Sequence, residues 1–143
     1  MKKSKENLNG ITNGTPVVGH AKGAIHYIRG EREEGDVAMK AASRTVGVAL
    51  GGIGGFFVIG PVGAFIGGIA GGGALDGITT GVESKIHGRF MPNGLILEYF
   101  NALNASSGKE RVGPIINLTT GLLFDGLTGY AAAQIVEQLL ENN

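Results

Sequence analysis

Residues 45–75, TVGVALGGIGGFFVIGPVGAFIGGIAGGGAL, decide the fold of this chain. The stretch contains 31 residues without a charge, and 12 of them are glycine. Three interpretations compete: a membrane segment, a core in which helix backbones approach closely, and a flexible low-complexity tract. A flexible glycine linker would carry serine and charge and would lack large apolar residues such as Phe56, Phe57 and Phe65, so the third interpretation is the weakest.

The glycines form two rows with the spacing of a helix face. Residues four apart lie on the same face of a helix, and small residues in such rows let two backbones pack closely. The pairs 47 with 71, 51 with 67 and 55 with 63 are all centred on Ile59. The first row is Gly47, Gly51 and Gly55, and the second is Gly63, Gly67 and Gly71.

Gly60 and Pro61 form the strongest break in the chain. Proline disfavours helical geometry in the residue before it and supplies no backbone N–H. A turn at Gly60 and Pro61 would bring the two glycine rows face to face. The sequence therefore predicts an antiparallel helical hairpin over residues 37–87, with Gly60 and Pro61 as its turn.

Helical periodicity continues outside the hairpin. Alternation with a period of two residues is rare, so the sequence predicts an all-α fold, a helical bundle built around this central Gly-rich antiparallel hairpin. Residues 1–14 are expected to be a flexible N-terminal arm, and residues 15–143 a single helical domain. The charged connector 30–36 ends in Asp36, which is expected to cap the next helix. Other helices are predicted over about 15–29, 95–104 and 114–140.

The composition argues against several classes of function. Twelve basic and twelve acidic side chains balance, so a nucleic-acid partner has little electrostatic support. The chain has no cysteine, which excludes disulfides and thiolate metal sites. Polar residues follow the first lysines where a secretory signal would need an apolar segment, so no signal peptide is predicted. Localisation stays open, with membrane association as one outcome.

Motifs for catalysis or cofactor binding are weak. GGIGGF, residues 51–56, lacks the spacing of a dinucleotide loop and the lysine of a phosphate loop. His20, His26 and His87 lack the spacing of a metal pair on one helix face. We therefore expect no enzyme activity, no cofactor and no metal site.

Three acids stand in apolar surroundings, Asp76, Glu98 and Asp125, and the basic residues available to pair with them are Arg44, Lys40, His87 and Arg111. A buried carboxylate must be paired or hydrogen-bonded, so capping or ion pairing is the simpler expectation for the three acids. The sharper hypothesis is that Asp76 and Asp125 line a polar path or act as protonation switches that release the hairpin at low pH.

The stretch from Gly19 to Gly72, with GDVAMKAASRT and the GGxxG rows as its most specific parts, resembles a glycine-rich domain of unknown function found in larger, mostly animal, proteins. The resemblance covers about residues 16–90. It implies a module that sits beside other domains, and it implies no activity and no catalytic residues. In a broader sense, the hairpin is similar to glycine-zipper membrane proteins.

Two functions follow as expectations. The first is membrane association or permeabilisation by a glycine-zipper domain that self-assembles, with a lipid bilayer and further copies or other protein domains as partners. Each arm has roughly 14 uncharged residues, or about 21 Å, against a hydrocarbon core of about 30 Å, so two full spans do not fit. The alternative is a soluble helical interaction or oligomerisation module with no membrane role.

Overall fold

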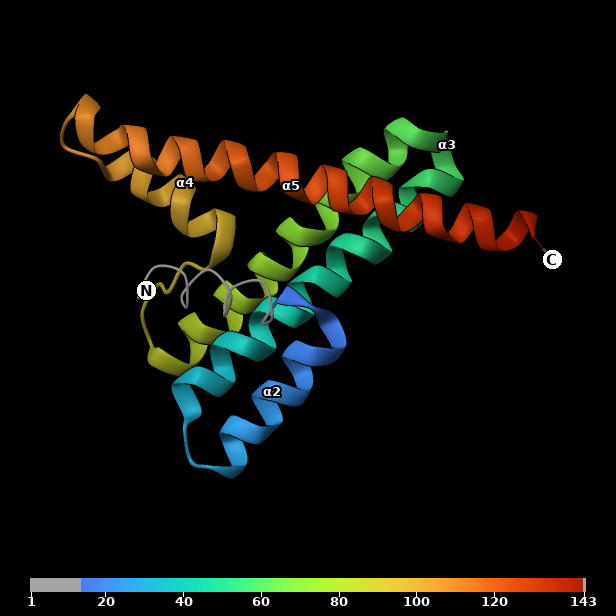
Figure 1. Ribbon diagram of the computed structural model, residues 1–143. Coiled ribbons are helices and arrows are strands. Elements are labelled where there is room, and N and C mark those ends of the chain that lie inside the picture. The colour runs from blue at the N-terminus through green and yellow to red at the C-terminus, as the bar shows by residue number, and fades with distance from the viewer. Residues whose placement is uncertain (1–13, 143) are drawn as a thin grey trace, which may run out of the picture. The chain divides into compact units, whose positions relative to one another are not determined.

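The computed structural model describes residues 14–142, which form four helices and contain no strand (Figure 1). The predicted all-α class is therefore confirmed for this part of the chain. The predicted N-terminal arm lies, except for Gly14, outside the described residues. The helices are α2 (Pro16–Ile28), α3 (Arg32–His87), α4 (Gly94–Asn104) and α5 (Gly108–Glu141).

The chain divides into two compact units, residues 1–46 and residues 47–143. The boundary falls inside α3, so the first unit holds α2 and the start of α3, and the second holds the rest. The prediction of a single domain over residues 15–143 stays a prediction.

In the first unit, α2 folds back on the start of α3 through a tight turn. Gly30 takes a φ of +79°, a left-handed conformation that favours glycine, and its N–H donates to the Tyr27 carbonyl at 3.0 Å. Glycines allow α2 and the start of α3 to pack closely. A Cβ atom on Gly23 would lie 2.6 Å from the Met39 side chain, and one on Gly35 would lie 2.9 Å from the Tyr27 ring.

The second predicted helix begins earlier than the sequence suggested. We expected a start near Val37 with Asp36 as cap, but α3 begins at Arg32. Glu33 and Glu34 occupy its first turn, where negative charge complements the helix dipole. Asp36 does not cap the helix, because it lies inside α3 after the first turn, and its carboxylate accepts a hydrogen bond from the Tyr27 hydroxyl.

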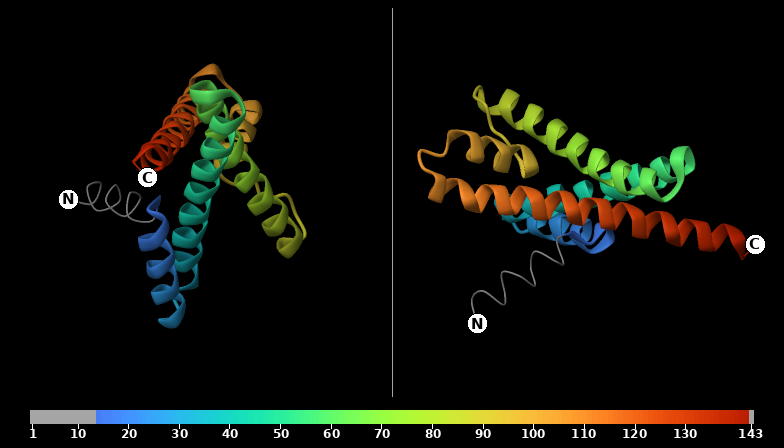
Figure 2. Two further views of the ribbon diagram at one scale, coloured as in Figure 1. Left: turned by 90° about the vertical axis from the view of Figure 1, so that its right-hand side faces the viewer. Right: turned by 90° about the horizontal axis from the view of Figure 1, so that it is seen from above.

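In the second unit, α3 is interrupted at two residues, Ile59 and Gly60. Gly60 has a φ of +69°, and Pro61 begins the returning arm with the fixed φ that suits a first helical position. From the break, residues 61–75 run back beside residues 47–59 (Figure 2), with Gly63 against Gly55 and Leu75 against Gly47. The break therefore lies where the sequence placed the turn.

The last helix also begins earlier than expected, at Gly108 rather than Pro114. Ser107 caps it, since the Ser107 hydroxyl accepts from the Glu110 N–H at 3.3 Å. The Glu110 carboxylate accepts from the Ser106 N–H at 3.1 Å, which completes a capping-box arrangement. This S-x-x-E signal outweighs Pro114, which the helix carries in its second turn.

The buried residues of the described chain are almost all glycine or alanine. Only Val48, Asp76, Thr80 and Asp125 are both buried and larger than alanine. The protein thus packs backbone against backbone in its interior, and its large apolar side chains lie mainly outside.

Candidate functional site

The two predicted glycine rows lie against each other along the hairpin. A Cβ atom on Gly51 would overlap the Gly67 carbonyl oxygen, and one on Gly55 would overlap the Gly63 carbonyl oxygen. The same overlap joins Gly71 to the Gly47 carbonyl oxygen. At these three levels the backbones touch directly, which permits dispersion and weak Cα–H···O contacts and leaves no room for side chains.

A second layer of close contacts joins α5 to both arms of the hairpin. A Cβ atom on Gly129 would lie 2.6 Å from the Gly68 Cα and 2.8 Å from the Ala64 carbonyl oxygen, and one on Gly52 would overlap Gly129 itself. Figure 1 shows α5 crossing the hairpin on the side of its kinked end. This crossing is not among the contacts predicted from the sequence. Its signal was Gly126 and Gly129 in LFDGLTG, residues 123–129.

Asp76 is 2% exposed and serves as a helix cap. Its carboxylate accepts from the Leu95 N–H at 2.9 Å, in the first turn of α4. Two further side chains on the same arm bind the preceding loop: the Thr80 hydroxyl accepts from the Asn93 N–H at 3.0 Å, and the Ser84 hydroxyl accepts from the Met91 N–H at 2.8 Å. We call Asp76, Thr80 and Ser84 the acceptor ladder.

The acceptor ladder works because two spacings match. Its members are four residues apart on a helix, a rise of about 6 Å, and the donors Met91 and Asn93 are two residues apart in the loop, a span of about 6.6 Å in extended chain, before α4 begins at Gly94. Pro92 and Gly94 fall between the donors, and a Cβ atom on Gly94 would overlap the Asp76 carboxylate. The ladder therefore fastens residues 91–95 to the second arm of α3, a role that the sequence analysis foresaw only as capping by Asp76.

The other predicted charged residues are placed differently. Asp125 is 4% exposed, and its Oδ2 would lie 2.6 Å from a Cβ atom on Gly72. Glu98 lies on α4, and its Oε1 accepts from the Asn117 side chain of α5 at 3.2 Å. Arg44 belongs to the first compact unit and the three acids to the second, so ion pairing of Arg44 with them stays a prediction.

His20 and His87 contact polar atoms of the protein. His20 Nε2 lies 3.3 Å from the Ser43 hydroxyl, and His87 Nδ1 lies 2.9 Å from the Glu83 carbonyl oxygen. Across residues 14–142, no group of three His, Asp or Glu side chains is arranged to hold a metal ion.

The kinked end of the hairpin is coated with exposed apolar side chains. We call Phe57, Val58, Ile59 and Val62 the apolar tip; they are 64%, 79%, 61% and 64% exposed. Within the described chain, α3 is the one helix that is long and apolar enough to cross a membrane, judged by length and composition. Of its most apolar 18-residue stretch, 17% is buried. Close glycine packing inside the hairpin thus leaves its large side chains facing outward.

Comparison with protein-family models, curated proteins and solved structures finds no match. The resemblance to a glycine-rich domain therefore stays a resemblance.

Proposed function

We propose that this protein is a non-enzymatic glycine-zipper domain that associates with membranes through the hairpin 37–87 and permeabilises them by self-assembly. The proposal includes a helical bundle with this hairpin at its centre. The observation that carries it is the inverted packing: glycine and alanine inside, large apolar side chains outside. Large exposed apolar surfaces on proteins mark sites of protein or membrane contact.

The apolar tip supplies a driving force for entry into lipid. Full burial of one Val, Ile or Phe side chain contributes about 1.5–3 kcal/mol, so these four largely exposed side chains together contribute roughly 4–8 kcal/mol, which supports reversible attachment to a membrane. Transfer of the glycine seam, the contact between the two glycine rows, to lipid costs little because its backbone groups are already bonded within helices, so the backbone groups that need partners are those at the break, Ile59 and Gly60. A hairpin with this construction can enter the hydrocarbon without rearranging its own interior.

The length of the two arms limits how deeply the hairpin can enter a bilayer. Roughly 14 uncharged residues per arm give about 21 Å, which is less than the hydrocarbon thickness of about 30 Å. We therefore propose that the tip enters one leaflet, with the acceptor ladder near the interface. Asp76 and the loop fastened to it would then remain near water.

Self-assembly is supported by a third glycine row. Gly73, Gly77 and Gly81 follow the same four-residue spacing on the second arm, and apart from the neighbouring backbone of their own helix no described atom lies within 4 Å of a Cβ atom on any of them. This row is free to take the close helix packing that Gly63, Gly67 and Gly71 already make. Helices in lipid associate through such rows, since hydrophobic drive is absent there.

A soluble interaction module is the alternative, and one observation favours it. Helix α4 has an apolar sequence, yet none of its residues is buried. A partner protein that covered α4 would satisfy this surface without any membrane.

Vesicle flotation separates the two functions. Purified protein is mixed with neutral or anionic vesicles at pH 7 and at pH 5, and is floated through a density gradient. The membrane function predicts co-flotation that persists in high salt, because apolar insertion is not screened. Protein that stays at the bottom as a monodisperse helical species under every condition would support the soluble module instead.

A further inference from the structure

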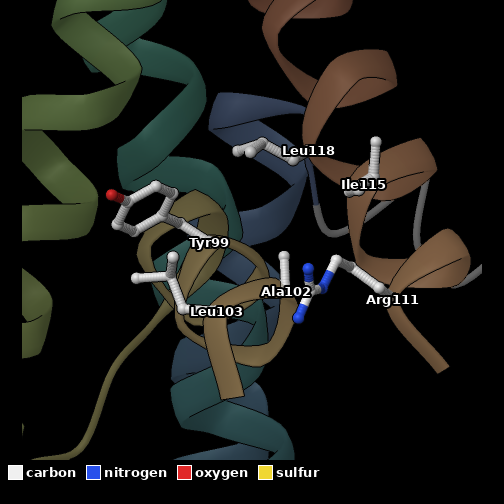
Figure 3. Close-up of a pocket in the computed structure, with 6 residues that line it drawn as sticks. All are labelled: Tyr99, Ala102, Leu103, Arg111, Ile115 and Leu118. Atoms are coloured by element: carbon white, nitrogen blue, oxygen red, sulfur yellow. The ribbon is translucent and has the colours of Figure 1, made fainter. Parts of the chain in front are cut away.

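A cavity of about 320 Å³ lies between α4 and α5, and none of its lining residues belongs to the hairpin. Helix α4 supplies one wall and the first turns of α5 supply the other (Figure 3). Five of the six lining residues are apolar or aromatic, and the sixth is an arginine. The lining residues are Tyr99, Ala102, Leu103, Arg111, Ile115 and Leu118.

The apolar side chains that line the cavity are largely exposed to solvent. Tyr99, Leu103 and Ile115 are 55%, 60% and 46% exposed, although all three belong to helices that contact each other. An apolar chain laid between them would remove this surface from water, and each methylene buried contributes a constant increment to affinity.

Arg111 supplies the charge at one end of the cavity. Its Nη2 donates to the Ala105 carbonyl oxygen at 3.2 Å, which holds the guanidinium at the end of α4 (Figure 3). That bond uses one of the five N–H donors of a guanidinium. The nearby acids are engaged elsewhere: Glu98 accepts from Asn117, and Glu110 accepts from the Ser106 N–H. No acid lines the cavity.

We propose that this cavity binds a free medium-chain fatty acid, with its alkyl chain between α4 and α5 and its carboxylate on Arg111. A guanidinium matches a carboxylate in geometry as well as in charge. The space of about 320 Å³ lies at the small end of ligand pockets, which suits one alkyl chain of about ten carbons better than the two chains of a bilayer lipid. This binding goes beyond the membrane function and does not depend on the hairpin.

The test uses the full chain and titration calorimetry below the micelle concentration. Dodecanoate is the probe, and dodecyltrimethylammonium has the same chain with the opposite charge. We expect saturable binding of one dodecanoate per chain and at least tenfold weaker binding of the cation. From hexanoate to decanoate, affinity should rise about threefold to fourfold per methylene, and it should level off beyond about ten carbons.

Two variants locate the site. Ala102→Phe fills the cavity and should abolish binding, and Arg111→Gln should weaken dodecanoate binding about tenfold. Lys109→Gln removes an exposed charge from the same helix without lining the cavity, and it should bind as the unmodified protein does. Equal affinity for the carboxylate and the cation, or dodecanoate binding indifferent to Arg111→Gln, would overturn the proposal. The comparison of head groups and chain lengths needs no variant, so the proposal stays testable if a variant does not fold.

Discussion

The carbonyl oxygen of Gly67 occupies the place where a Cβ atom of Gly51 would stand. The obstacle is backbone, so no side-chain rotation can make room for even a methyl group. Gly54, three residues further along the same arm, has open space around its Cα. The two positions therefore separate the effect of close packing from the effect of helix propensity.

Gly51→Ala and Gly54→Ala should change stability in opposite directions. Overpacking at Gly51 should lower the free energy of unfolding by about 1–3 kcal/mol. At Gly54, alanine should raise it by up to about 1 kcal/mol, because alanine favours a helix interior over glycine. Denaturant titration followed by circular dichroism measures both changes. Stabilisation by both substitutions would contradict the close backbone packing of Gly51 against Gly67.

Asp76→Ala should loosen the start of α4. The Leu95 N–H would lose its acceptor, and removal of a capping side chain costs about 0.5–2 kcal/mol. Hydrogen exchange at the Leu95 amide should therefore accelerate by up to about thirtyfold, since about 1.4 kcal/mol corresponds to a factor of ten. Asp76→Asn keeps an acceptor oxygen and should show a smaller change. Equal exchange in all three proteins would exclude the cap.

Alkaline pH should weaken the turn between α2 and α3. The hydrogen bond from the Tyr27 hydroxyl to Asp36, with burial and the charge of Asp36, raises the pKa of Tyr27 above its usual value of 10.0. Folding favours the protonated form of Tyr27. The stabilisation that the Tyr27–Asp36 hydrogen bond gives to the folded state is therefore complete below pH 10, and it is lost as the pH rises through the pKa of Tyr27 in the folded protein. Tyrosinate absorbance measures this, and Asp36→Asn should lower the pKa. An unchanged titration in Asp36→Asn would rule out the contact.

Gly77→Leu should reduce self-assembly while the monomer still folds. The open row of Gly73, Gly77 and Gly81 would lose its close approach to a second copy, whereas the Cβ atom of the new side chain meets no described atom outside its own helix backbone within 4 Å. Gly54→Leu is the matched control, because it is also open and lies outside the row. Sedimentation in detergent micelles gives the oligomeric state. Oligomers that persist in Gly77→Leu would place the assembly surface elsewhere.

The glycine seam was accessible from sequence because it depends on spacing alone. Rows repeated every four residues, centred on a Gly-Pro break, specify both the faces in contact and their register. Capping at Ser107 is also readable from the sequence as S-x-x-E, a signal that the prediction of a helix start at Pro114 did not use. Helix starts often depend on such local competition.

The crossing of α5 and the acceptor ladder depend on tertiary geometry. Gly52, Gly68 and Gly129 meet only because α5 approaches the hairpin at one place, and no periodicity within one segment specifies that place. Thr80 and Ser84 look like ordinary helix residues until an extended loop lies beside them. The sequence thus predicts the contacts within a hairpin better than the contacts between segments distant in the chain.

The most direct test of the membrane proposal is the depth of the apolar tip in a bilayer. The chain has no cysteine, so Val58→Cys gives one site for an environment-sensitive fluorophore, and Ile28→Cys gives a control that is 86% exposed outside the hairpin. With vesicles, we predict a blue shift and quenching by spin-labelled lipid acyl chains at position 58 but not at position 28. Emission from position 58 that stays characteristic of water with neutral and anionic vesicles, at pH 7 and at pH 5, would contradict the proposal.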